Sequence, residues 1–424
     1  MLQSLLREEV INCMRCGLCL ATCPTYSLLK LERASPRGRL ALLRAVSEGR
    51  LTPSENLVRE IYLCLLCEAC ETACPAGVKV GHLVERVRAE TKGWVPPSIW
   101  ERALRRLVFQ GLFPHPRRLE FLARILRSYQ RLGLESLVRQ LGISQRLPKS
   151  LTIMEALLPT LPNRFFSSVA GEFPPAGRER GCVAFFPGCI MNLIYGEVNG
   201  ATIRVLAQNG YRTVVRPGQL CCGAPHVAVG EVETALRLAR QNIDLFSQVR
   251  AEVIITNCAG CGAMLKEYGE LLEDDKTYAA KANAFSHKVK DINEFLTALL
   301  PLSGHVEELN RKVTYHDPCH LAHAQGITQE PRNILRSIPG LELVELNEST
   351  WCCGGAGIYN ITHSDLSMQL LDRKMANIAA TGVETVVTSN PGCLLQLELG
   401  VKRAGLNIEA VHILELLDRA YQGS

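Results

Sequence analysis

Cysteine is the residue type with the clearest chemistry in this chain, and most of its 18 cysteines fall into short repeated groups. The stretch CMRCGLCLATCP, residues 13–24, spaces four thiols by two, two and three residues and ends in proline. The same pattern returns at residues 64–75 as CLLCEACETACP. Pairs of the CxxC type also bind zinc. A triple CxxCxxC followed by CP, present twice, is instead typical of a pair of [4Fe–4S] clusters.

The two motifs predict a crossed set of ligands. In such pairs, three closely spaced thiolates hold one cluster while the fourth ligates the other cluster. We therefore expect one cluster on Cys13, Cys16, Cys19 and Cys74, and the second on Cys64, Cys67, Cys70 and Cys23. Disulfides are not expected, because the cytosol keeps thiols reduced.

A second kind of cysteine group, built around an adjacent pair, occurs twice in the C-terminal half. The first copy consists of Cys189, Cys221, Cys222, Cys258 and Cys261, and the second of Cys319, Cys352, Cys353 and Cys393. Corresponding cysteines lie 130 to 132 residues apart, which indicates a duplicated domain. Four or five soft thiolates select iron–sulfur clusters or zinc. Asn390 stands where a fifth cysteine would complete the second copy, which leaves a vestigial or zinc-bearing second site open.

Each copy alternates short β-rich runs with longer helical ones. Strands are predicted at VAFFP, YRTVVRP and EVIITN in the first copy, and at KVTYHD, LELVELN, TVVTSN and IEAVHI in the second. This alternation is typical of α/β domains with parallel sheets. The cysteines follow strands, so their thiols should converge at the carboxyl edge of the sheet. The glycine after each pair, Gly223 or Gly354, is expected to let the backbone approach a bulky cluster.

The chain of 424 residues thus divides into four expected segments. Residues 1–95 form a helical ferredoxin-like domain with two [4Fe–4S] clusters, and residues 96–180 form a basic helical and Pro-rich linker. Residues 181–305 and 306–424 are the two paired-cysteine domains. The predicted fold class is α+β multidomain: an all-α N-terminal domain, then two duplicated α/β domains with parallel sheets. Cys182, the one cysteine left over, is expected to be a buried small hydrophobe.

Positive charge is concentrated in the linker. Residues 101–150 hold ten Arg and one Lys against three Glu, although the whole chain is only +5. Apolar residues at helical spacing predict amphipathic helices, which either pack on the cluster domains or dock on anionic lipid or an acidic partner. Nothing else supports nucleic-acid binding. The sequence shows no signal peptide and no apolar run of about 20 residues. We expect a cytoplasmic protein, at most peripheral at the inner face of the cell membrane through residues 101–150.

The order of these motifs resembles that of glycolate oxidase iron–sulfur subunits over essentially the whole chain. The shared motifs are SPRGRLALL, CCGAPH, LKEYG, HDPCHLAHAQG, CCGGAGIYN and NPGCLLQL. The N-terminal part also resembles the helical two-cluster domain of succinate dehydrogenase iron–sulfur subunits. The paired-cysteine copies are similar to the CCG domain of heterodisulfide reductases, in which five-cysteine versions hold unusual iron–sulfur clusters. The resemblance implies one or two further [4Fe–4S] clusters, on the cysteines of the first copy and on those of the second.

By the same resemblance, the chain is the electron-transfer subunit of a glycolate or D-lactate oxidase complex, with no catalytic residue or substrate site of its own. Electrons then come from FAD on a partner subunit and leave to a quinone-type acceptor. The sequence has neither a GxGxxG loop after a strand nor a Walker loop, so the flavin is expected on the partner only. Three alternatives stay open: a catalytic subunit of heterodisulfide reductase type, the iron–sulfur subunit of an anaerobic glycerol-3-phosphate dehydrogenase, and a non-enzymatic zinc scaffold.

Four histidines, His226, His316, His320 and His323, lie beside the paired-cysteine motifs. The functional interpretation is that they donate hydrogen bonds to cluster sulfur or carry protons to a quinone. The ordinary interpretation is a helix cap or a local hydrogen bond. On a helix beginning near Pro318, His320 and His323 would share a face.

Overall fold

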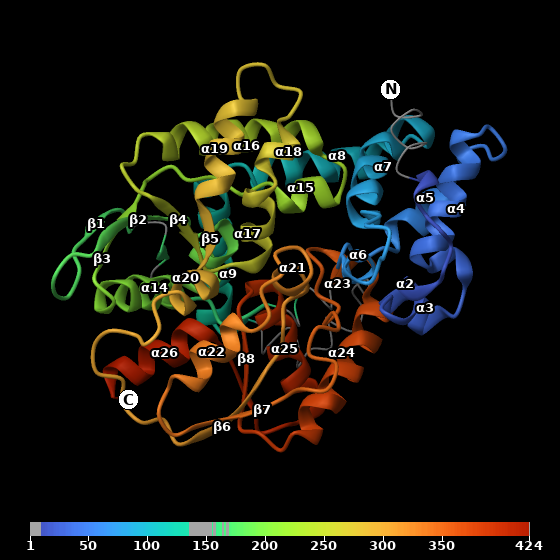
Figure 1. Ribbon diagram of the computed structural model, residues 1–424. Coiled ribbons are helices and arrows are strands. Elements are labelled where there is room, and N and C mark those ends of the chain that lie inside the picture. Colours follow the sequence, from blue (N-terminus) through green and yellow to red (C-terminus); the bar gives the residue numbers. More distant parts are fainter. Residues whose placement is uncertain (1–9, 135–154, 156–157, 163–164, 167–168, 424) are drawn as a thin grey trace.

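The computed structural model describes residues 10–134, 155, 158–162, 165–166 and 169–423, and Figure 1 shows their arrangement. Part of the expected linker, including Pro148, therefore lies outside the described residues. None of the helices in the described ranges is long and apolar enough to cross a lipid bilayer.

Helices are the regular secondary structure of the described N-terminal residues, as predicted. They are α2 (Leu18–Ala21), α3 (Pro24–Leu29), η1 (Glu32–Ala34), α4 (Pro36–Ser47), α5 (Glu55–Tyr62), α6 (Ala69–Thr72) and α7 (Val80–Trp94). Ser35 and Ser54 begin α4 and α5 by accepting hydrogen bonds from the backbone N–H groups of Gly38 and Leu57. Leu43, Ile61 and Val84 lie in the apolar core between these helices.

The linker continues as helix, in α8 (Ile99–Arg105), the π-helical turn η2 (Arg106–Leu112) and α9 (Pro116–Arg131). The predicted amphipathic packing is only partly observed. Leu119 and Ala123 of α9 are buried against Phe165 and Leu193. Other large apolar side chains face solvent: Trp100, Leu104, Leu107, Phe121, Ile125 and Leu132.

The first paired-cysteine copy is built on a five-stranded sheet of order β1-β3-β2-β4-β5. The strands are β1 (Gly171–Phe173), β2 (Gly181–Phe185), β3 (Tyr211–Val215), β4 (Val253–Thr256) and β5 (Val289–Asp291), and only the β1–β3 pairing is antiparallel. The helices are α13 (Cys189–Ile194), α14 (Gly196–Gln208), α15 (Ala224–Ala228), α16 (Val232–Ser247), α17 (Ala259–Lys266), α18 (Tyr268–Leu271), α19 (Ala279–Lys288) and α20 (Ile292–Thr297). The three strands predicted here are confirmed.

The second copy repeats this plan with four parallel strands in the order β7-β6-β8-β9. They are β6 (Arg311–Tyr315), β7 (Leu341–Val344), β8 (Thr385–Thr388) and β9 (Glu409–His412), and all four were predicted from the sequence. The helices are α21 (Cys319–Ala322), α22 (Glu330–Arg336), α23 (Tyr359–Thr362), α24 (Ser364–Ala380), α25 (Pro391–Ala404) and α26 (Ile413–Gln422).

The two copies exchange their final helices, as Figure 1 shows. Helix α26 of the second copy packs on α14 of the first, where Arg204 and Asp418 form an ion pair at 2.7 Å. Reciprocally, α20 of the first copy packs on α22 of the second, and the Thr297 hydroxyl donates to the Glu330 carbonyl at 2.9 Å. A single apolar core runs through both copies and includes Val183, Val313 and Leu416. The exchange draws the carboxyl edges of the two sheets together.

Candidate metal centres

The first N-terminal cavity combines thiols of both ferredoxin-type motifs. It opens to solvent and is lined by Cys13, Cys16, Cys19, Cys74 and also Cys70. The CxxCxxC loop wraps it by left-handed turns at Arg15, with φ 57°, and Gly17, with φ 85°. The Val78 N–H donates to the Cys74 sulfur at 3.3 Å, a type of contact that tunes the potential of a cluster. This donor set and this cradle fit a [4Fe–4S] cluster.

The second N-terminal cavity has the reciprocal composition. It is lined by Cys23, Cys64, Cys67 and Cys70. Its loop repeats the left-handed turns of the first, at Leu66, with φ 54°, and Glu68, with φ 58°. Cys70 borders both cavities, so the two candidate centres are direct neighbours.

The first paired-cysteine copy brings all five of its predicted thiols to the carboxyl edge of its sheet. Cys189 begins α13, the adjacent pair lies in the loop between β3 and α15, and Cys258 and Cys261 stand at the start of α17. The thiols of Cys221 and Cys261 donate to Cys222 and lower its pKa to about 6. Four of the five thiols are buried, and soft, water-excluded thiolates fit an iron–sulfur cluster.

The second copy gathers Cys319, Cys352, Cys353 and Cys393 in the equivalent place. Hydrogen bonds from the thiols of Cys352 and Cys393 hold the pKa of Cys353 well below its ordinary value. Lys374 is also buried here. Its ammonium donates to the carbonyls of Glu348 and Ser349, in the loop that leads to the adjacent cysteine pair.

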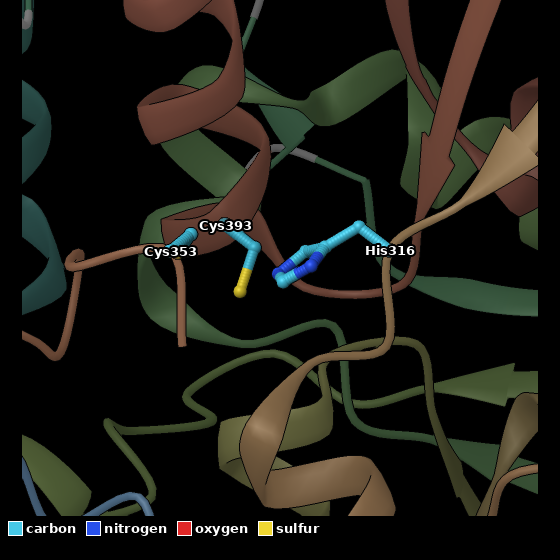
Figure 2. Close-up of side chains that lie close together, drawn as sticks. All are labelled: His316, Cys353 and Cys393. Carbon is cyan, nitrogen blue, oxygen red and sulfur yellow. The ribbon is translucent and has the colours of Figure 1, made fainter. Parts of the chain in front are cut away.

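His316 joins these thiols. Its ring nitrogen and the sulfurs of Cys353 and Cys393 all lie within 4.8 Å of one another, and all three residues are buried. Figure 2 shows the imidazole pointing toward the two cysteines from the loop after β6. From the sequence, His316 was one of four histidines that could contact cluster sulfur, and it was not distinguished from the other three. Its position directly after a predicted strand, like that of the cysteines, was the available signal.

The glycines after the adjacent pairs lie between the thiols and the following helix. The Gly354 backbone N–H donates to the Cys352 sulfur at 3.5 Å, in keeping with the expected close approach of the backbone. Gly223 and Gly354 adopt φ of 101° and 89°, a left-handed conformation that favours glycine. A side-chain carbon at Gly354 would lie 2.6 Å from the Ser367 carbonyl oxygen of α24. The nearest neighbour at Gly223 is Ala235 of α16. A side chain at either position would therefore point at the following helix.

Asn390 connects the two paired-cysteine centres. Its side-chain N–H donates to the Cys393 sulfur at 3.5 Å, while its carbonyl oxygen accepts from the backbone N–H of Gly260 at 3.1 Å. The same oxygen lies 3.7 Å from the Cys258 sulfur of the first copy. The residue that interrupts the cysteine pattern is thus the bridge between the two copies.

Three of the four flagged histidines hold parts of the fold together. His226 donates from Nε2 to the carbonyl of Phe109 in the linker at 2.9 Å. His320 donates from Nε2 to the carbonyl of Leu66 at 2.8 Å, and His323 Nδ1 lies 3.1 Å from the Thr72 hydroxyl. The predicted shared face of His320 and His323 is therefore the face that meets the N-terminal region. Cys182, expected to be buried, is partly exposed on β2.

The four thiol groups form one continuous series. The first N-terminal set borders the second through Cys70. The second N-terminal set meets the second paired-cysteine copy, where Cys67 packs in one apolar cluster with Cys352 and Cys319. That copy meets the first through Asn390. The sequence predicted the membership of each group but not this order.

Comparison with known proteins matches a family model to each of these regions along the chain. A 4Fe-4S dicluster domain model matches residues 9–78, and a cysteine-rich domain model matches residues 183–266 and again 313–398. Between them, residues 100–158 match a model described as the linker region of the glycolate oxidase iron-sulfur subunit.

Full-length relatives share this organisation. The chain is 43% identical to a probable glycolate oxidase iron-sulfur subunit of Bacillus subtilis over 96% of its own length and 93% of the relative's. It is 35% identical to the glycolate oxidase iron-sulfur subunit of Escherichia coli, over 91% and 89% of the two chains. A solved structure of a hypothetical protein from Helicobacter pylori matches with a TM-score of 0.53 at 10% identity, covering 91% of this chain and 68% of that one, which shows a similar fold. With its cysteine groups, linker and duplicated domains all matched, the chain belongs to the glycolate oxidase iron–sulfur subunit family.

Proposed function

We propose that this chain is the electron-transfer subunit of a complex that oxidises glycolate or D-lactate. Electrons enter from FAD on a partner subunit and leave to a quinone-type acceptor. The bound iron–sulfur clusters supply one-electron carriers, and this chain supplies their ligands and their insulation from water. The crossed cysteine sets of residues 13–74 hold two [4Fe–4S] clusters, and the two paired-cysteine copies hold one cluster each.

The continuous series of thiol groups is the observation that carries this proposal. A protein that only stored clusters would have no need to place the thiol groups next to one another across three regions of the chain. Here Cys70 is shared between two cavities, Cys67 belongs to the same apolar cluster as Cys352, and Asn390 touches cysteines of both copies. Such an arrangement suits electron transfer from cluster to cluster through all the regions of the chain.

Metal content tests the number of clusters. Anaerobically purified protein should contain about sixteen iron atoms and as many sulfides per chain, four for each of four [4Fe–4S] clusters. The Cys353→Ala variant should lose about four of these iron atoms. The matched control Cys182→Ala should lose none, because Cys182 lies on β2 outside the thiol groups. About eight iron atoms, with zinc in the remainder, would contradict electron transfer through four clusters.

Reduction by substrate tests the partner. Glycolate should bleach the iron–sulfur absorbance of this chain only when the partner FAD subunit is present. Bleaching by glycolate in the absence of that subunit would place a substrate site on this chain and contradict the proposed role.

We further propose that the linker helices α8 and α9 rest on an anionic lipid surface, from which a quinone is accessible. Trp100 is 85% exposed and Phe121 67% exposed, and the exposed arginines Arg102, Arg117 and Arg124 lie on the same helices. Each basic residue near an anionic membrane adds about 1 kcal/mol of attraction. The protein should therefore sediment with anionic liposomes at low salt and be released at high salt. Equal sedimentation with neutral liposomes, or none with either kind, would contradict this placement.

A further inference from the structure

We infer that His316 is a ligand of the cluster in the second paired-cysteine copy, where its Nε2 supplies the donor that the chain lacks at Asn390. The inference rests on the proposed function in one respect, namely that this copy holds an iron–sulfur cluster. It adds a non-cysteine ligand to that cluster and makes the two paired-cysteine centres chemically different.

Backbone register places His316 within the thiol group by the same route as the cysteines. The His316 N–H donates to the Val387 carbonyl at 2.9 Å, directly after β6. In the first copy, the Phe186 N–H donates to the Ile255 carbonyl at 2.8 Å, directly after β2. His316 and Phe186 therefore occupy equivalent positions in the duplicated fold.

Two compensating differences distinguish the copies. Where the first copy has phenylalanine at 186 and cysteine at 258, the second has histidine at 316 and asparagine at 390. The number of soft or borderline donors around each centre is therefore five in both copies. A vestigial site would lose a donor without gaining one.

The hydrogen bonding of His316 leaves Nε2 directed at the thiols. Its Nδ1–H donates to the Ser349 carbonyl at 3.2 Å, which assigns the tautomer with a lone pair on Nε2. Among the described residues, Nε2 has no oxygen or nitrogen partner, although the side chain is 0% exposed. The polar neighbour of the ring on this side is the Cys353 sulfur, with which His316 forms a hydrogen bond, so the ring faces the thiols that would hold the cluster. Metal-ligating histidines typically bond a backbone carbonyl through their other ring nitrogen, as His316 does.

Asn390 cannot fill this role itself. Its side-chain oxygen already accepts from the Gly260 N–H, and its nitrogen donates to the Cys393 sulfur. Imidazole suits iron and zinc as a ligand, whereas an amide carbonyl suits harder ions. Histidine in place of cysteine also removes a negative charge, and such replacement raises the reduction potential of iron–sulfur centres. The second centre should therefore be easier to reduce than the first.

Isotope labelling of the unmodified chain gives the direct test. Protein made with 15N-histidine and with natural histidine should be reduced with dithionite and compared by pulsed EPR. We expect a strongly coupled nitrogen that changes from 14N to 15N with the label. In His316→Cys this coupling should disappear while about sixteen iron atoms remain, because a thiolate replaces the imidazole. In the matched control His323→Gln, whose native ring contacts Thr72, the coupling should persist.

The outcomes separate this inference from the proposed function. Full iron content without any histidine nitrogen coupling would overturn the ligand role of His316 and leave the proposed electron transfer through four clusters intact. Loss of the coupling in His323→Gln but not in His316→Cys would overturn the assignment to His316. Stoichiometric zinc with only about eight iron atoms would overturn both proposals.

Discussion

At the scale of single residues, the glycine after each cysteine pair can be substituted to test why the loop that holds the pair requires glycine. Gly354 combines a left-handed φ of 89° with a backbone oxygen 2.6 Å from where a side chain would begin. Gly354→Ala should therefore lower the free energy of unfolding by about 3 kcal/mol or more, since conformational strain adds to the overlap with α24. Chemical unfolding of the anaerobic protein measures this loss.

Gly382 provides the control for that substitution. It has a similar left-handed φ of 64°, but no atom lies within 4 Å of the position a side-chain carbon would take. Gly382→Ala should cost only about 1–2 kcal/mol. Equal losses in the two variants would mean that the contact with α24 is not what requires glycine in the paired-cysteine motif.

Residue types predicted the donor sets because thiol spacing is a local property. A CxxCxxC run can wrap one cluster without information from the rest of the chain, and the structure places the thiols of the two runs around two neighbouring cavities. His316 and Asn390 were not predictable in this way. Their roles depend on which atoms approach them across the junction of two sheets, and no spacing within the sequence encodes that approach.

At the scale of elements, α26 has an unusual N-cap that should respond to pH. His412 Nδ1 accepts from the backbone N–H of Leu414 at 3.2 Å, while Nε2–H donates to the Asn257 carbonyl of the other copy at 3.0 Å. Both bonds need the neutral ring. Burial lowers the pKa of His412 to about 4.

This depressed pKa predicts a loss of stability in mild acid. Below the ordinary histidine pKa of about 6.5, His412 is protonated in the unfolded chain but stays neutral in the folded chain. The free energy of unfolding therefore falls as the pH falls toward 4. Between pH 7 and pH 5, His412 should account for about 2 kcal/mol of that fall. His412→Asn, which keeps a good N-cap without a titrating group, should show a correspondingly shallower pH dependence in chemical unfolding. The same slope in both proteins would contradict a neutral, buried His412.

Helices and strands were predictable where the sequence itself carries an apolar pattern. They were not predictable where contacts with distant parts of the chain determine whether an element forms or where it packs. Seven strands stood out as β-branched runs. Strands β1 and β5 are only three residues each and lack such a run. The exchange of α20 and α26 was also not predictable. An amphipathic pattern shows that a helix has a buried face, but not which copy of a duplicated domain covers it.

At the scale of the whole molecule, the N-terminal region is held against both paired-cysteine copies. Toward the first copy, Arg88 is buried, stacks on Tyr62 and donates to the carbonyls of Cys64 and Ala228 at 2.6 and 2.7 Å. Toward the second copy, the Tyr359 hydroxyl donates to the Leu63 carbonyl at 3.2 Å. These contacts converge on the backbone just before and within the second ferredoxin-type motif, so the loop that holds Cys64 and Cys67 is also the loop that docks the three regions.

His320 is the residue through which this docking can be tested, because it separates two roles that the sequence left open. Its Nε2–H donates to the carbonyl of Leu66, between Cys64 and Cys67, and its neighbour Cys319 packs beside Cys67. If positioning is its role, His320→Leu should leave that carbonyl unpaired at a cost of about 1–3 kcal/mol and slow quinone reduction by the assembled complex. His320→Gln, which retains an N–H donor, should behave nearly as the native chain. Iron content should stay unchanged in both variants, so that the rate reports the junction and not cluster loss. Equal slowing in His320→Gln and His320→Leu would instead favour a proton-carrying histidine, since glutamine donates a hydrogen bond but does not exchange a proton near neutral pH.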